Sequence, residues 1–251
     1  MVYFGQNKLL YVPNMPSVEM KFPEANPLGF RSPEEHNLDF EDARVTTSDG
    51  YTLYGWFVKQ VDPQKVETLI FFHANAGNIG FRLPNIVKLH EHCDANILIV
   101  GYRGYGHSEG TPTEEGLKLD SEAILDWALK HPDIDNNKIF VFGRSLGGAV
   151  AIHLCSRRPE NIQGLILENT FSCISDMVDR IFPYVSVLKR YLLEIDWNSI
   201  ESIKTIKTPM LFISGRKDQI VPFEQMDRLY DATKEARHKD MYKIENGTHN
   251  E

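Results

Sequence analysis

Short, uninterrupted runs of apolar residues recur along the chain from residue 68 onward, separated by longer segments with a helical spacing of apolar positions. Runs without polar alternation are typical of strands buried on both faces of a parallel sheet. The segments between them are long enough for crossover helices. The predicted strands span residues 68–72, 96–100, 138–142, 164–167, 210–213 and 240–244. The pattern therefore predicts an α/β protein with a mostly parallel central sheet and helices on both faces.

Two patterns precede this alternation. Residues 44–46 and 51–54 flank an Asp49-Gly50 turn signal, which predicts an antiparallel hairpin at one edge of the sheet. The first forty residues carry five prolines, so residues 1–40 are interpreted as an extended arm on the surface. The remainder, 41–251, is expected to form a single domain.

Within that domain, one helix start and one insertion stand out. Thr111 is predicted to cap a helix, with Pro112 at its first position and Glu114 three residues after the cap. Residues 170–202 are longer than a simple crossover and keep a helical spacing only in parts. This segment is predicted to be a helical lid, whose apolar residues either line an acyl pocket or belong to the core.

Composition and charge narrow the class of protein. The 251 residues have a formal net charge of −8, which argues against a nucleic-acid partner. No apolar stretch is long enough to span a bilayer. Cys93, Cys155 and Cys173 lack a metal or redox spacing, and we interpret them as buried thiols in a reducing compartment. We expect no cofactor, and the sequence predicts no particular oligomeric state.

The strongest chemical signal is the sequence Gly143-Arg144-Ser145-Leu146-Gly147, which lies between a predicted buried strand and an apolar helix. Glycines in this pattern permit a sharp strand-to-helix turn that exposes the serine hydroxyl above the sheet. The N-terminus of the following helix favours developing negative charge. Ser145 is therefore the candidate nucleophile, and Arg144 is expected to pack or form a salt bridge.

A serine nucleophile needs a base, and the base needs an acid that orients it. His249 lies in a turn-rich loop after the last predicted strand and is the preferred base; His238, in a basic turn, is the alternative. Asp218 follows the strand at 210–213 and is the preferred acid. Glu168, at the end of the preceding strand, is its rival.

Acyl transfer also needs two backbone N–H donors for the oxyanion. One is assigned to Leu146, the residue after the nucleophile. The other is expected from the loop at 73–78, with Asn75 preferred and Ala74 as the alternative. His73, at the start of this loop, is interpreted as a structural residue that braces the loop.

Five motifs resemble the family of alpha/beta hydrolase domain-containing protein 13 and its fungal relatives. They lie at residues 72–80, 101–106, 142–154, 167–171 and 247–250. The resemblance implies an α/β-hydrolase fold and a triad made of Ser145, Asp218 and His249. It also implies a serine hydrolase whose wider relatives include protein depalmitoylases. An acyl ester or thioester is then the expected substrate.

The chain departs from the family pattern in two places. Family members are usually anchored by one N-terminal transmembrane helix, and this chain lacks that span, so a cytoplasmic or peripheral membrane location is expected. Members also continue through a final helix after the histidine, and this helix is missing from the chain, which stops at Glu251. A mobile His249 is therefore expected, and a catalytically weak or inactive binding protein is the alternative function.

Overall fold

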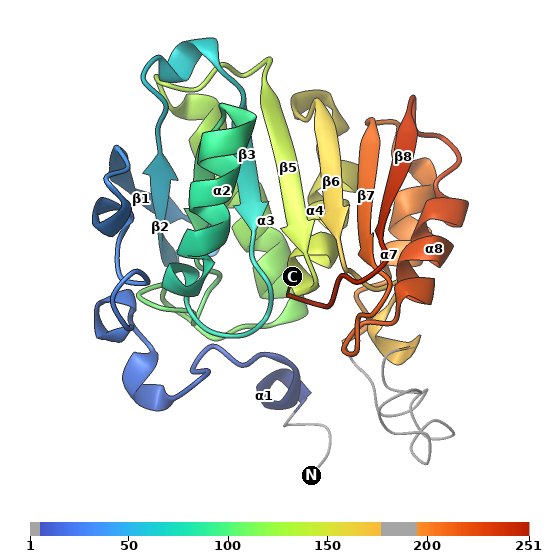
Figure 1. Cartoon of the computed structure of the whole chain (residues 1–251), viewed down its shortest axis with the longest axis horizontal. Coiled ribbons are helices and arrows are strands. Elements are labelled where there is room, and N and C mark those ends of the chain that lie inside the picture. Colours follow the sequence, from blue (N-terminus) through green and yellow to red (C-terminus); the bar gives the residue numbers. More distant parts are fainter. Residues whose placement is uncertain (1–5, 177–194, 251) are drawn as a thin grey trace.

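A computed structural model describes residues 6–176 and 195–250 of the chain. Within these residues, eight strands form one sheet in the order β1-β2-β4-β3-β5-β6-β7-β8 (Figure 1). The strands from β4 to β8 pair in parallel, whereas β2 is antiparallel to both β1 and β4. The predicted class, a mostly parallel sheet with an antiparallel hairpin at one edge, is confirmed.

The strand positions follow the apolar runs of the sequence. Every position of β3 and β4 is buried, which explains why these strands show no polar alternation. The bounds are β1 Phe40–Thr46, β2 Thr52–Val58, β3 Thr68–Phe72, β4 Asn96–Val100, β5 Ile139–Arg144, β6 Gly164–Glu168, β7 Met210–Gly215 and β8 Lys239–Ile244.

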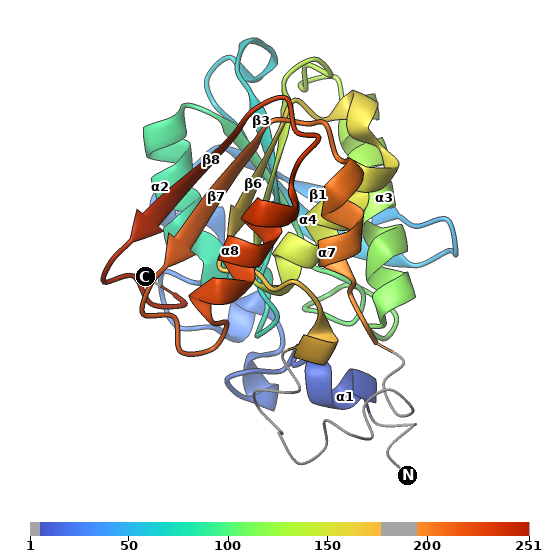
Figure 2. The same ribbon diagram turned by 90° about the vertical axis from the view of Figure 1, so that its right-hand side faces the viewer.

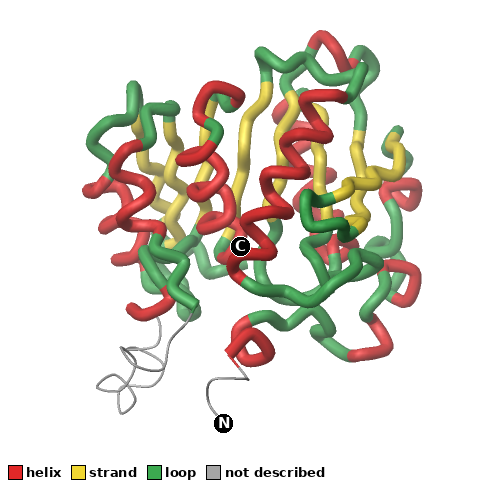
Figure 3. Tube along the Cα trace, turned by 180° about the vertical axis from the view of Figure 1, so that it is seen from behind, coloured by secondary structure: helices red, strands yellow, loops and turns green. Residues whose placement is uncertain are grey.

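Helices cover both faces of the sheet. Helix α2 lies on one face, and α3, α4, α7 and α8 lie on the other (Figures 2 and 3). The bounds are α1 Gln6–Leu10, α2 Leu83–Cys93, α3 Glu114–Lys130, α4 Leu146–Arg157, α7 Ser199–Ser202 and α8 Phe223–Ala232. Side chains of β3 alternate between two cores, because Ile70 and Phe72 pack with α3 and α4 while Leu69 and Phe71 pack with α2.

The arm is not extended throughout. After α1 it forms three short 3₁₀ helices, at Val18–Met20, Pro23–Ala25 and Pro33–His36. Pro23 and Pro33 each occupy the first helical position, where a missing N–H costs nothing. The prolines therefore start short turns as well as restricting the chain between them.

Two sequence-based details are wrong. Helix α3 begins at Glu114, and its cap is Thr113, whose side chain accepts a hydrogen bond from the Gly116 N–H at 3.0 Å. Thr111 lies in the preceding loop, whereas Thr113, two residues later and with an extended backbone, directly precedes the free N–H groups of the first turn. Cys93 is exposed at the end of α2, whereas Cys155 and Cys173 are buried as expected.

Most of the predicted lid, residues 177–194, lies outside the described residues. Its two flanks lie side by side, since the Ile174 N–H donates to the Asp196 carbonyl at 2.8 Å. Within residues 6–176 and 195–250, every helix falls short of the length and apolar character that a bilayer span requires.

The cap of α3 gives a direct test of this assignment. Thr113→Ala should lower the free energy of unfolding by about 1 kcal/mol, because one N–H of the first turn loses its partner. Thr111→Ala is the matched control and should change it by less than about 0.5 kcal/mol. Urea denaturation of both variants measures the difference. Equal losses would show that Thr113 is not the cap.

Candidate active site

Ser145 stands at a sharp turn between β5 and α4. Its backbone has φ +54° and ψ −119°, a combination that side-chain-bearing residues rarely adopt. The glycine two residues later is required by close packing, since a Cβ on Gly147 would lie 1.9 Å from the Phe72 carbonyl oxygen. A Cβ on Gly143 would lie 2.3 Å from the Gly147 oxygen. The turn therefore depends on both glycines of the motif.

Hydrogen bonds hold this unusual backbone in place. The Ser145 N–H donates to the Glu168 carbonyl at 3.0 Å. The Ser145 carbonyl accepts from the Thr170 hydroxyl at 2.7 Å and from the Gly148 N–H at 2.9 Å. Leu146 is the first residue of α4, so its N–H is one of the donors that a helix N-terminus leaves free. The turn thus places a hydroxyl and a backbone donor next to each other.

His249 and Asp218 meet at one end of the sheet. The His249 Nδ1 atom lies 2.7 Å from Asp218 Oδ2, and both residues are 8% exposed. The other carboxylate oxygen of Asp218 accepts from the N–H groups of Ile220 and Val221, each at 2.8 Å. These bonds fix the carboxylate and leave Oδ2 for the ring, which favours the tautomer with a proton on Nδ1.

The loop that carries His249 is fixed by side chains from two neighbouring strands. Arg144, the last residue of β5, donates from Nη2 to the His249 carbonyl at 2.8 Å. Asn169, directly after β6, donates to the Thr248 and His249 carbonyls at 3.0 and 3.3 Å and accepts from the Gly215 N–H at 2.8 Å. His249 is therefore buried and held, in contrast to the mobile position expected from the sequence.

Among the hydrogen bonds of the described residues, none joins the Ser145 hydroxyl to the His249 ring. Such bonds are often long in the absence of substrate and tighten when it binds. The structure thus brings His249 and Asp218 together directly. Ser145 is linked to His249 through its neighbour in sequence, Arg144, which bonds to the histidine backbone.

The rival acid and base lie in other arrangements. His238 is exposed and pairs with Asp240 at 2.7 Å, away from the buried carboxylates. The Glu168 carboxylate lies 3.5 Å from Arg144 Nε, and burial raises its pKa while the arginine opposes that effect. Glu168 therefore balances the charge of the arginine that holds the histidine loop.

His73 has the structural surroundings that the sequence predicted. The ring is fully buried, its Nδ1 lies 2.8 Å from the Ala74 carbonyl, and it stacks on Tyr102 with 4.1 Å between ring centroids. The Tyr102 hydroxyl donates to the His73 carbonyl at 2.9 Å. Burial, assisted by the nearby Arg82 charge, lowers the pKa of His73 to about 3. A ring that stays neutral in this way suits bracing of the loop.

The Asn75 side chain has a partner that sequence reasoning missed. Its Oδ1 atom accepts a hydrogen bond from the Tyr105 hydroxyl at 2.7 Å, and both side-chain ends also bond to the backbone of the N-terminal segment at Leu10 and Val12. The only signal in the sequence was the apolar run at residues 9–12 before the prolines. A contact over more than sixty residues leaves no local pattern.

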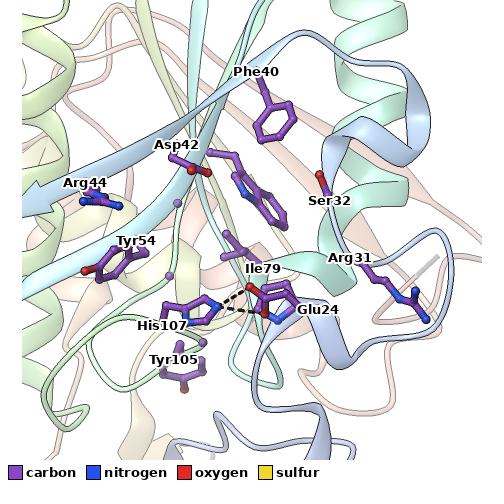
Figure 4. Close-up of a pocket in the computed structure, with 15 residues that line it drawn as sticks. Glu24, Arg31, Ser32, Phe40, Asp42, Arg44, Tyr54, Ile79, Tyr105 and His107 are labelled. Carbon is purple, nitrogen blue, oxygen red and sulfur yellow. Dashed lines mark hydrogen bonds and ion pairs between the residues drawn. The ribbon is translucent and has the colours of Figure 1, made fainter.

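A separate cavity of about 360 Å³ lies between the arm and the strands β1 and β2 (Figure 4). His107 Nε2 lies 2.8 and 3.0 Å from the two Glu24 carboxylate oxygens at this cavity, and Trp56 and Tyr54 supply aromatic walls. Ser145 does not line it. The described residues hold no group of three or more His, Cys, Asp or Glu side chains arranged for a metal ion.

Comparison with known proteins identifies the class. Residues 67–192 match the model of the alpha/beta hydrolase fold, and residues 139–250 match that of the serine hydrolases named FSH1. The chain belongs to the alpha/beta hydrolase family.

Similar proteins occur in fungi and plants. The chain is 42% identical over 237 residues to protein bem46 of Schizosaccharomyces pombe, covering 92% of this chain and 79% of that protein. It is 38% identical over 236 residues to the alpha/beta hydrolase domain-containing protein WAV2 of Arabidopsis thaliana, covering 90% and 74%. These matches confirm the family resemblance, while membership of the group around alpha/beta hydrolase domain-containing protein 13 stays a prediction.

Solved structures share the fold. The esterase Pf2001 of Pyrococcus furiosus superposes with a TM-score of 0.70 at 22% identity, covering 87% of this chain and 85% of that one. Acetyl xylan esterase 1 of Thermoanaerobacterium superposes with a TM-score of 0.62 at 18% identity, covering 84% and 78%. The predicted α/β-hydrolase fold is thereby confirmed.

The buried His73 predicts a pH dependence of stability. Folded His73 stays neutral down to about pH 3, whereas an unfolded histidine takes up a proton below about pH 6.5. Stability should therefore be lost as the pH falls through this window, by about 2 kcal/mol between pH 7 and 5. Urea denaturation at several pH values measures it, with His73→Gln as the control that should show a flatter dependence. Parallel curves for the two proteins would contradict the assignment.

Proposed function

We propose that the protein is a serine hydrolase that cleaves carboxylic ester or thioester bonds through an acyl-enzyme. The observation that carries this proposal is the buried 2.7 Å contact between His249 Nδ1 and Asp218, held beside the strained turn at Ser145. The match of residues 139–250 to a serine hydrolase model supports it.

In the proposed reaction, the Ser145 oxygen attacks the substrate carbonyl while His249 Nε2 takes the hydroxyl proton. The ring then carries a positive charge, and Asp218 stabilises that charge from the other side through Nδ1. The proton passes next to the leaving alcohol or thiol. Water, deprotonated by the same ring, finally releases the acid from Ser145.

The tetrahedral oxyanion is stabilised by two backbone donors in this proposal. The Leu146 N–H is free at the start of α4, where the helix dipole also favours negative charge. The Asn75 N–H, with that of Ala74 as the alternative, supplies the second donor from the loop after β3. Donors fixed in advance stabilise the transition state more than mobile ones do.

Two classes of substrate are consistent with this chemistry. Carboxylic esters are favoured by the similarity in fold to solved esterases. Long-chain acyl thioesters, with the protein in peripheral contact with a membrane, are favoured by the resemblance to a family with depalmitoylase relatives. Turnover of p-nitrophenyl esters and acyl thioesters of two to sixteen carbons distinguishes the two classes by their relative kcat/KM.

A fluorophosphonate probe tests the nucleophile. The protein should be labelled, and Ser145→Ala should abolish labelling and ester turnover because no other activated hydroxyl takes the place of Ser145. Asp218→Asn should lower kcat by roughly 10³–10⁴ with a small change in KM, since the ring loses its tautomer and its counter-charge. Intact-mass spectrometry and initial rates provide the measurements.

Thr113→Ala serves as the control, because it weakens α3 without touching the site and should keep wild-type kcat. Labelling that survives Ser145→Ala would refute the assignment of the nucleophile. A folded wild-type protein that turns over no ester or thioester would favour the alternative of an inactive binding protein.

A further inference from the structure

The N-terminal segment Leu10–Val12 is bonded to the loop that follows β3. The Asn75 side-chain amide donates to the Leu10 carbonyl, and its oxygen accepts from the Val12 N–H at 3.3 Å. The Gly77 N–H donates to the Val12 carbonyl at 3.2 Å. Three hydrogen bonds thus join segments that lie more than sixty residues apart. The side-chain amide of Asn75 thus donates to one backbone group of the segment and accepts from another, as the backbone of a neighbouring β-strand does.

Tyr11 anchors this segment from its centre. The side chain is 2% exposed and belongs to the same core as residues of α3 and α4, and burial raises the pKa of its hydroxyl. Its oxygen accepts a hydrogen bond from the Trp197 indole Nε1 at 3.0 Å. Trp197 is itself buried, and its backbone N–H donates to the Glu114 carboxylate at 3.1 Å. The anchor therefore reaches Trp197, which lies in the described C-terminal part of the predicted lid.

The loop held in this way contains a position that requires glycine. Gly77 has φ +74°, and a Cβ there would lie 2.8 Å from the Met15 carbonyl, so the arm packs closely against it. The Tyr105 hydroxyl shares the Asn75 oxygen with Val12 from the opposite side. Both ends of the Asn75 side chain are therefore occupied, which fixes the direction of the backbone N–H on the same residue.

We propose that Leu10–Val12 is a positioning element for the oxyanion loop, with Tyr11 and the Asn75 side chain as its positioning residues. The inference rests on the proposed function, because it assigns the segment to the donor that would stabilise the oxyanion. An N–H displaced by about 1 Å costs on the order of a hundredfold in rate. The segment, which belongs to the N-terminal arm, would thus affect the rate of acyl transfer by positioning this donor.

Two variants test the element without removing the donor itself. Asn75→Ala keeps the backbone N–H but removes every side-chain bond to Leu10, Val12 and Tyr105. It should lower kcat on the order of a hundredfold with KM within threefold. Tyr11→Phe keeps the buried ring and removes only the hydroxyl partner of Trp197. It should lower kcat by a smaller factor, about three- to tenfold.

The readout that a merely structural role would leave unchanged is the affinity for an alkyl trifluoromethyl ketone. This inhibitor becomes a tetrahedral oxyanion when the Ser145 oxygen adds to its carbonyl and the hydroxyl proton passes to His249. Its Ki should rise in the two variants by the same factor by which kcat/KM falls. Thr113→Ala, which destabilises the protein by loss of the α3 cap, should change neither quantity. Tyr11→Phe keeps the test available if Asn75→Ala does not fold.

The outcomes separate this inference from the function on which it rests. A wild-type protein that is neither labelled at Ser145 nor active would remove the proposed function and this inference together. An active wild type, silenced by Ser145→Ala, whose Tyr11→Phe and Asn75→Ala variants keep kcat and Ki within twofold would overturn the positioning role alone. A change confined to KM would overturn it as well.

Discussion

The turn at Ser145 is the constraint on which the rest of the site depends. Helix α4 begins so close to β5 and to the end of β3 that neither Gly143 nor Gly147 leaves room for a Cβ, and the serine between them takes a backbone conformation with positive φ. Such a conformation persists only when its surroundings over-determine it. Here β6 and the residues that follow it bond to the serine backbone, and β3 packs against the glycine. Contacts with the neighbouring parallel strands therefore hold the backbone of Ser145 in this conformation.

The same strand ends position the histidine. Parallel strands bring their carboxyl ends to one edge, so Arg144 at the end of β5, Asn169 after β6 and Asp218 after β7 all lie near the loop after β8. Each contributes a different contact, two to the backbone of the loop and one to the ring. A change in the register of any of these strands would break its contact with the His249 loop. The order of the strands in the sheet therefore determines which of these side chains lie next to one another at its carboxyl edge.

Local patterns in the sequence were enough to locate the strands of the sheet and the turn that carries Ser145. Continuous apolar runs located the buried strands, and the glycine-flanked serine marked the turn, because both follow from steric rules that act over a few residues.

Contacts between distant segments could not be predicted from such local patterns. The pairing of Asn75 with Leu10 and Val12 and the link from Tyr11 to Trp197 have no periodicity that a sequence could reveal. Thr111 and Thr113 are both threonines and flank Pro112, so the sequence alone does not show at which of them the helix begins. The cap is decided by the path of the backbone before α3. The catalytic roles of Ser145, Asp218 and His249 stay predictions, although the contact between the last two is what those roles require.

The position of His249 after the final strand has a consequence for biosynthesis. The ribosome adds Ser145 to the chain more than one hundred residues before it adds His249, whose imidazole is proposed to activate the serine. A nascent chain with β5 and α4 already outside the ribosome would carry an unactivated hydroxyl, because its base is still in the exit tunnel. Under the proposed function, acyl transfer would begin only after β8 has joined the edge of the sheet, so the proposed activity would depend on completion of the sheet at that edge.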